Sequence, residues 1–63
     1  MRKIIEILFV EKTPTYTRTH VLLDTGEECV GYGEDFNVGD LCEHWFDEKW
    51  GVAKVRKSKP RDL

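Results

Sequence analysis

One stretch, residues 36–57, constrains the fold of this chain more than any other. It holds both tryptophans, and its charge changes from acidic to basic along its length. Its first half can be interpreted either as a β-strand or as a short helix, and that choice decides the fold class. Because the chain has only 63 residues, it forms a single domain with a small core, and this stretch must supply much of it.

The first interpretation of this stretch is a β-hairpin with a strand over 41–46, a reversal over 47–49 and a return strand over 50–57. In the return strand, Val52, Ala53 and Val55 alternate with basic residues, which is typical of a half-buried strand. The Gly-Asp pair at 39–40 favours a turn just before the first strand.

The second interpretation is a short helix at about 40–50. Asp40 would be its N-cap, Glu43 would complete a capping box and Gly51 would follow its C-terminus. On a helical wheel the apolar residues collect on one half and the charged residues on the other. The local pattern therefore favours the helix, whereas the strand-like sequence upstream favours the hairpin. We prefer the hairpin, and an α+β fold with this helix is the alternative.

The sequence before residue 36 predicts three short strands, over 2–12, 16–24 and 27–33. Thr13-Pro14 ends the first strand, and Asp24-Thr25-Gly26 makes a hairpin turn after the second. Gly31 and Gly33 indicate a bulge, a sharp bend or a close backbone approach, and we expect Phe36 to point inward. The predicted fold class is all-β: a small five-stranded, SH3-like or OB-like, partly open barrel over residues 1–57, followed by a basic polar tail over 58–63.

The alternation within these strands predicts which side chains form the core. We expect it to contain Ile5, Ile7, Phe9, Val21, Leu23, Val30, Tyr32, Leu41, Val52 and Val55.

Composition argues for a protein of the cytoplasm. The longest uncharged apolar run near the start, Ile7 to Val10, is too short for a signal peptide or a membrane span. We therefore expect a cytoplasmic location and no membrane association. Two cysteines are too few for a disulfide scaffold, so both are expected to be reduced thiols.

No residue pattern predicts a catalytic or metal site. Cys29, Cys42 and His44, with Asp40 or Glu43 as a further ligand, lack the paired spacing of zinc sites. Cys42 and His44 would lie about 7 Å apart on a strand, too far for a nucleophile and its base. A glycine-rich phosphate loop is also missing. The expectation is a protein without cofactor, metal or enzymatic activity.

The aromatic content predicts a protein-binding role. A core this small does not easily hide both indoles, whose N–H groups need acceptors when buried. An exposed tryptophan beside carboxylates makes an aromatic anchor with an acidic rim, as at interface hot spots. The predicted partner-binding residues are Trp45, Phe46, Asp47, Glu48 and Trp50.

The acidic middle of the chain adds to this expectation. Residues 22–49 contain a single basic residue, Lys49, and would steer a basic partner. We expect a non-enzymatic adaptor or inhibitor that docks on a larger protein, a role typical of small accessory proteins of bacteria or their viruses. Formation of a homodimer is a further way to support so small a core.

The alternative function is binding of single-stranded nucleic acid. The C-terminal part carries a basic stripe that would contact phosphates, and exposed aromatic rings would stack on bases. The acidic middle of the chain opposes this reading. The predicted nucleic-acid-binding residues are Lys54, Arg56, Lys57, Lys59 and Arg61.

Overall fold

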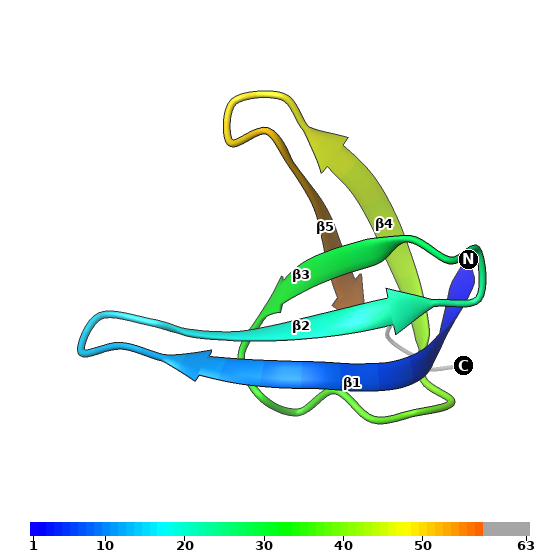
Figure 1. Cartoon of the computed structure of the whole chain (residues 1–63), viewed down its shortest axis with the longest axis horizontal. Coiled ribbons are helices and arrows are strands. Elements are labelled where there is room, and N and C mark those ends of the chain that lie inside the picture. Colours follow the sequence, from blue (N-terminus) through cyan, green and yellow to red (C-terminus); the bar gives the residue numbers. More distant parts are fainter. Residues whose placement is uncertain (58–63) are drawn as a thin grey trace, which may run out of the picture.

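The computed structural model describes residues 1–57, which form five strands and no helix (Figure 1). The strands make one sheet that closes on itself in the order β1-β2-β3-β5-β4. The all-β prediction is confirmed. No helix of the described range is long and apolar enough to cross a membrane. The strands are β1 Arg2–Lys12, β2 Thr17–Leu23, β3 Glu28–Tyr32, β4 Leu41–Asp47 and β5 Val52–Lys57.

The hairpin interpretation of residues 40–57 is confirmed, and the alternative helix is wrong. Strand β4 pairs antiparallel with β5 from Cys42 opposite Lys57 to Asp47 opposite Val52. The Asp47 carbonyl accepts the backbone N–H of Gly51 at 2.7 Å, and Gly51 has a φ of 69°. Glycine adopts this left-handed conformation without steric cost. As a strand, this segment pairs with β5 and β1 and places Cys42 in the core. These contacts with distant segments are not contained in the local pattern that favours the helix.

The ring is closed by short contacts. Strands β3 and β5 run parallel and pair at one position, Val30 opposite Lys54. Strands β1 and β4 pair at two, Arg2 opposite Cys42 and Lys3 opposite Leu41. The far halves of the β1–β2 and β4–β5 hairpins therefore project from the barrel in different directions (Figure 1).

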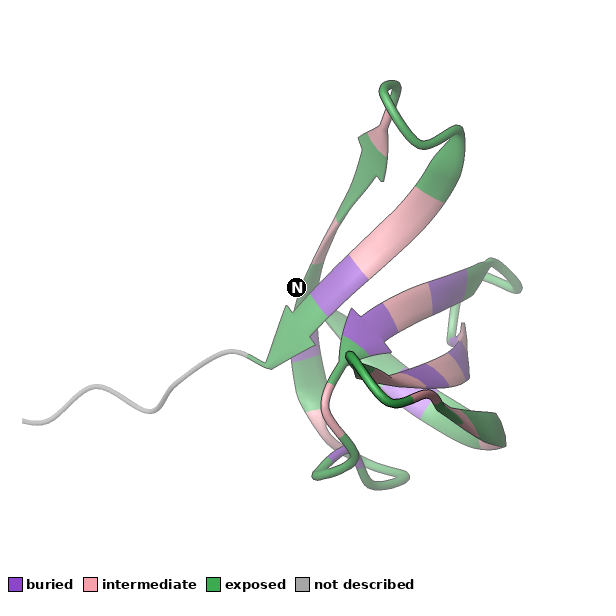
Figure 2. Cartoon of the chain, turned by 90° about the vertical axis from the view of Figure 1, so that its left-hand side faces the viewer, coloured by how far each residue is buried: buried purple, intermediate pink, exposed green. Residues whose placement is uncertain are grey.

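The core lies where the strands cross, while the turn of the β4–β5 hairpin is exposed (Figure 2). Of the predicted core residues, Val21, Leu23 and Val55 are buried and Ile7 packs against the core. Thr19 is also buried, and its hydroxyl donates a hydrogen bond of 2.6 Å to the Gly33 carbonyl. The buried apolar residues are Ile4, Val21, Leu23, Cys29, Phe36, Cys42 and Val55.

The other predicted core positions are wrong, mostly by one residue. Strand β1 is apolar on both faces, so its sequence does not reveal which face points inward, and register shifts between Ile4 and Phe9 alter the alternation. Ile4 is buried in place of Ile5, and Cys42 in place of Leu41. Val30 is half-buried. The exposed ones are Ile5, Phe9, Tyr32, Leu41 and Val52.

Strand β3 shows the physical reason most clearly. Its inward positions are Cys29 and Gly31, and the Phe36 ring lies directly against Gly31. A Cβ atom at Gly31 would lie 2.3 Å from Phe36 Cζ. The expectation that Phe36 points inward is confirmed. Of the alternatives predicted for Gly31, a close approach is the one observed, made by the Phe36 ring, whereas Gly33 has a positive φ of 92° and no such tight contact. The Phe36 ring occupies the space on the inner face of β3, so Val30 and Tyr32 lie on its outer face.

Candidate functional site: an aromatic hairpin and the groove beside it

The β4–β5 hairpin exposes three aromatic side chains. Trp45 is 43% exposed, Phe46 63% and Trp50 65%. Trp45 and Phe46 are consecutive in β4 and so point to opposite faces of the strand, while Trp50 lies in the turn. The projecting hairpin therefore carries aromatic rings on both faces and at its tip.

The two predicted acidic rim residues differ in their surroundings. Asp47 accepts an ion-pair contact of 2.9 Å from Lys54 Nζ and a hydrogen bond from the Trp50 backbone N–H. The Lys54 contact holds the pKa of Asp47 below its usual value. Glu48 is exposed in the turn and makes no salt bridge within residues 1–57. Of these two carboxylates, only Glu48 is without an ion pair among the described residues.

The basic stripe predicted for nucleic acid is compensated where the structure describes it. Each of its first three residues contacts a carboxylate. Lys59 and Arg61 lie outside the described residues. A phosphate backbone would have to displace these carboxylates to reach the cations. The contacts are Lys54 to Asp47 at 2.9 Å, Arg56 to Glu43 at 2.7 Å and Lys57 to Asp40 at 3.5 Å.

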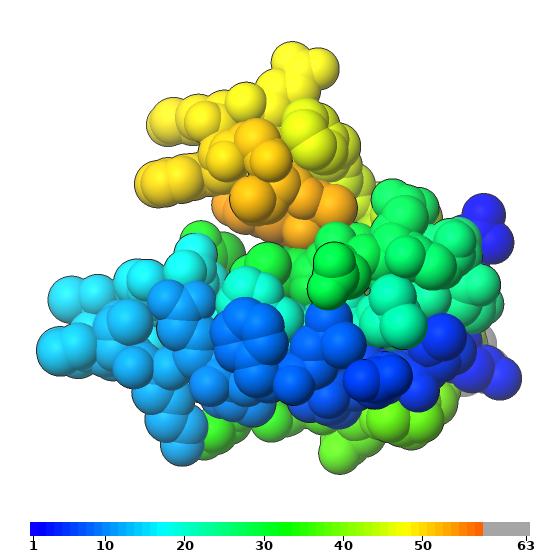
Figure 3. Space-filling view, viewed as in Figure 1, coloured from blue at the N-terminus to red at the C-terminus, as the bar shows by residue number. Residues whose placement is uncertain are grey.

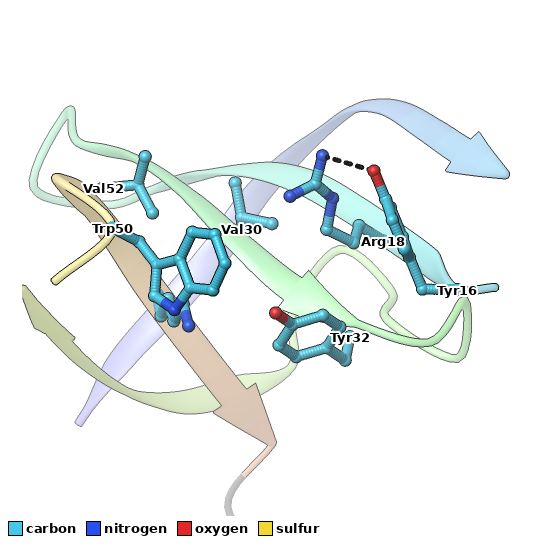
Figure 4. Close-up of a pocket in the computed structure, with 7 residues that line it drawn as sticks. Tyr16, Arg18, Val30, Tyr32, Trp50 and Val52 are labelled. Atoms are coloured by element: carbon cyan, nitrogen blue, oxygen red, sulfur yellow. Dashed lines mark hydrogen bonds between the residues drawn. The ribbon is translucent and has the colours of Figure 1, made fainter. Parts of the chain in front are cut away.

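A hollow that sequence analysis did not predict lies between the two projecting hairpins (Figure 3). We call it the aromatic groove; its volume is about 350 Å³. Three aromatic rings reach it from three different segments: the β1–β2 connection, β3 and the β4–β5 turn (Figure 4). Its lining residues are Tyr16, Arg18, Val30, Tyr32, Trp50, Val52 and Lys54.

Cations of the aromatic groove lie over its rings. The Arg18 guanidinium is 4.5 Å from the centroid of the Tyr16 ring. Lys54 Nζ is 5.5 Å from the Tyr32 centroid and 5.6 Å from the Trp50 centroid. These are the distances of cation–π contacts. The two cations of the groove, Arg18 and Lys54, therefore lie against its aromatic rings.

Glu11 compensates the Arg18 charge. Its Oε1 accepts hydrogen bonds from Arg18 Nη2 at 2.7 Å and Nε at 3.2 Å, and lies 3.3 Å from His20 Nε2. The Tyr16 hydroxyl donates to Oε2 at 3.3 Å. These contacts, that with Arg18 first, lower the pKa of Glu11. Both cations of the aromatic groove are thus already paired, Arg18 with Glu11 and Lys54 with Asp47.

A second hollow of about 390 Å³ adjoins the aromatic groove and shares Val30 and Val52 with it. Phe9 and His20 form part of its wall and stack with ring centroids 4.0 Å apart. Glu28, at the start of β3, also lines it and makes no ion pair among residues 1–57. Among the described residues, Glu28 is thus the one carboxylate that lines either hollow, and it is uncompensated there.

The residues considered for metal or thiol chemistry do not form a site. Cys29 and Cys42 are buried free thiols. Burial raises the pKa of Cys29 to about 11 and also raises that of Cys42, which disfavours the reactive thiolate. Among the described residues, the carboxylate oxygen nearest to His44 Nε2 is Glu27 Oε1, at 3.7 Å. Within residues 1–57, no group of three or more His, Cys, Asp and Glu side chains is arranged to hold a metal ion.

Fold and surface together define a small all-β barrel with an exposed aromatic hairpin and an open groove beside it. No protein-family model, curated protein or solved structure matches the chain. The side chains of these two surfaces are therefore the basis on which a function is inferred.

Proposed function

We propose that this protein is a non-enzymatic binding module that docks on a larger protein through its β4–β5 hairpin. The observation that carries the proposal is the exposure of Trp45, Phe46 and Trp50 on one projecting hairpin. Exposed aromatic side chains are enriched at interface hot spots. Aromatic side chains bury about 150–250 Å² each, whereas one partner contributes about 800 Å² to a standard interface. The groove beside the hairpin would supply the remaining area.

The strand order supports an OB-like description of the barrel. OB-folds bind ligands on the face of strands 2 and 3, between the loops that follow strands 1 and 4. The aromatic groove has the same position: Tyr16 comes from the β1–β2 connection, Tyr32 from β3 and Trp50 from the β4–β5 turn. This correspondence supports a binding role without indicating a ligand.

Charge favours a protein partner over nucleic acid. The cations of the aromatic groove and the three described residues of the predicted basic stripe, Lys54, Arg56 and Lys57, contact carboxylates, and the whole chain has a net charge of −2. Among the described residues, these paired cations offer less of the free positive charge that dominates affinity for a phosphate backbone. The net negative charge of the whole chain would instead favour the approach of a basic protein surface.

Single-stranded nucleic acid is the second candidate, because Tyr16, Tyr32 and Trp50 together would make stacking platforms. Stacking depends little on sequence, so this function would require affinity for an unstructured oligonucleotide, reduced by salt. The double change Arg56→Ala and Lys57→Ala should then weaken that affinity and flatten its salt dependence.

Capture of a partner from a bacterial lysate, with and without nuclease and at two salt concentrations, tests the proposal. We expect one protein band that survives nuclease and is lost, by about tenfold or more, with Trp45→Ala or Phe46→Ala. Val38→Ala is the control, because Val38 is 62% exposed but lies outside the hairpin. Thermal unfolding checks that each variant still folds cooperatively.

Two results would contradict protein docking through the hairpin. One is a band that both aromatic variants retain. The other is recovery of nucleic acid that high salt releases, which would favour the second candidate.

A further inference from the structure

The two hollows beside the hairpin together have the length of a short extended peptide. They meet at Val30 and Val52, and the outward residues of β3, Tyr32 and Glu28, lie in one hollow each. These two residues are four positions apart on a strand, which corresponds to about 13 Å. An extended segment of about five residues would therefore contact both.

At the Tyr32 end of this path, Lys54 Nζ lies 5.5 and 5.6 Å from the Tyr32 and Trp50 ring centroids, and the ring surface that remains exposed can contact an apolar side chain. Tyr32 is 59% exposed and Trp50 65%, and their rings reach the groove from β3 and from the hairpin turn (Figure 4). Val30 also lines this groove. The Trp50 indole N–H makes no hydrogen bond within the described part of the chain. It is thus available to donate to a ligand carbonyl, as amphipathic aromatic residues do at interfaces.

The charges along the path select the sign of the ligand. Arg18 and Lys54 are paired with Glu11 and Asp47 at 2.7 and 2.9 Å, so an anionic ligand would have to displace a carboxylate. Glu28 makes no ion pair among residues 1–57. A basic side chain would find a free carboxylate at this end, whereas a phosphate or an acidic side chain would be repelled.

From these observations we infer that the partner places an extended segment in the two hollows, with a large apolar side chain against Tyr32 and Trp50 and a Lys or Arg about four residues away at Glu28. The inference rests on the proposed protein-docking function and adds the chemistry of the partner's recognition element.

A phage-displayed library of random linear 12-residue peptides, selected against the full chain, tests this inference. We expect the enriched peptides to share an aromatic or large aliphatic residue and a Lys or Arg about four positions apart. In fluorescence polarisation with one enriched peptide, Tyr32→Ala should weaken binding about tenfold or more. Glu28→Gln should weaken it about threefold to tenfold and flatten its salt dependence.

Glu6→Gln is the matched control for the charge. Glu6 is an exposed β1 carboxylate that lines neither hollow and makes no ion pair within residues 1–57. Its substitution should leave peptide affinity and its salt dependence unchanged. A second peptide has its basic residue replaced by norleucine. The Glu28→Gln variant should bind this peptide and the original peptide with equal affinity.

Three results would overturn the inference: no enriched motif, enrichment of acidic peptides, or a peptide whose affinity Tyr32→Ala and Glu28→Gln both leave intact. A dT12 oligonucleotide that displaces the peptide more strongly than an acidic peptide of equal charge would also overturn it. If Trp45→Ala and Phe46→Ala abolish capture of the lysate protein while Tyr32→Ala and Glu28→Gln do not, hairpin docking stands and the inference about the groove falls.

Discussion

At the scale of single residues, the pair Gly31 and Phe36 determines which face of β3 turns inward. A side chain at Gly31 would meet the Phe36 ring, with Cζ at 2.3 Å and Cε2 at 2.8 Å from the added Cβ. Both members of the pair were predictable in kind, since a strand glycine indicates a close approach. The outward orientation of Val30 and Tyr32 was not predictable, because the Phe36 ring that packs on the inner face of β3 comes from a loop outside the strand.

Gly31→Ala is therefore expected to destabilise the protein by about 1–3 kcal/mol, the usual cost of overpacking a core. Phe36→Leu removes part of the ring at a cost of its own. The double variant should lose less stability than the sum of the two, by about 0.5–3 kcal/mol, because the smaller side chain relieves the clash. Urea unfolding followed by tryptophan fluorescence measures all three. Strictly additive losses would show that Gly31 and Phe36 are not in contact.

At the scale of elements, the turns and strand number were predictable and the inward faces were not. Asp24-Thr25-Gly26 marks the reversal after β2, and Gly26 has a positive φ. The reversal predicted over 47–49 extends to Gly51, which also has a positive φ, so the return strand begins at Val52 and not at Trp50. By contrast, strand β1 and residues 41–46 mix apolar and polar groups on both faces. Their register is set by pairing with distant strands, which a local pattern does not contain.

The same reasoning predicts unequal stability within the sheet. Strand β2 pairs with β1 along its whole length and with β3 over residues 18–22. The far half of the β4–β5 hairpin, around Phe46 and Ala53, pairs only within itself. Amide hydrogen exchange measured by NMR should show the slowest amides of β2 exchanging about tenfold or more slowly than the slowest amides of that far half. Equal protection would mean that the hairpin is held by more than its own ladder.

At the scale of the whole molecule, the sequence predicted a barrel with exposed aromatic groups but not the groove between its hairpins. The groove is made by Tyr16, Tyr32 and Trp50, which come from three segments. Its existence depends on a barrel closed by a single β3–β5 pair, which leaves the hairpins apart. Similarly, the carboxylates that compensate Arg18 and Lys54 lie across strand pairs, so composition alone does not reveal that these cations are paired.

The buried thiols of Cys29 and Cys42 and the paired carboxylates of Glu11 and Asp47 determine the pH range over which the folded protein is stable. The pKa values of Glu11 and Asp47 are lowered from 4.5 and 3.8, chiefly by Arg18 and Lys54. A lowered pKa stabilises the folded state above the unfolded value, and this contribution is lost as pH falls through the folded value. Burial raises the pKa of Cys29 from 9.0 to about 11, so its contribution is present below pH 9.0 and is lost as pH rises toward 11.

The expected profile of unfolding free energy is thus a plateau between about pH 5 and 9 with a loss on either side, measured as the urea midpoint at each pH. Glu11→Gln with Asp47→Asn should flatten the acidic loss. Cys29→Ala should flatten the alkaline loss in part, because burial also raises the pKa of Cys42. Both sets of substitutions should also lower the free energy of unfolding on the plateau itself. Glu34→Gln is the control, because its ion pair with Lys12 joins side chains that are more than half exposed and contribute little. An acidic loss that is as steep in the double variant as in the parent would show that Arg18 and Lys54 do not hold these carboxylates in the folded protein.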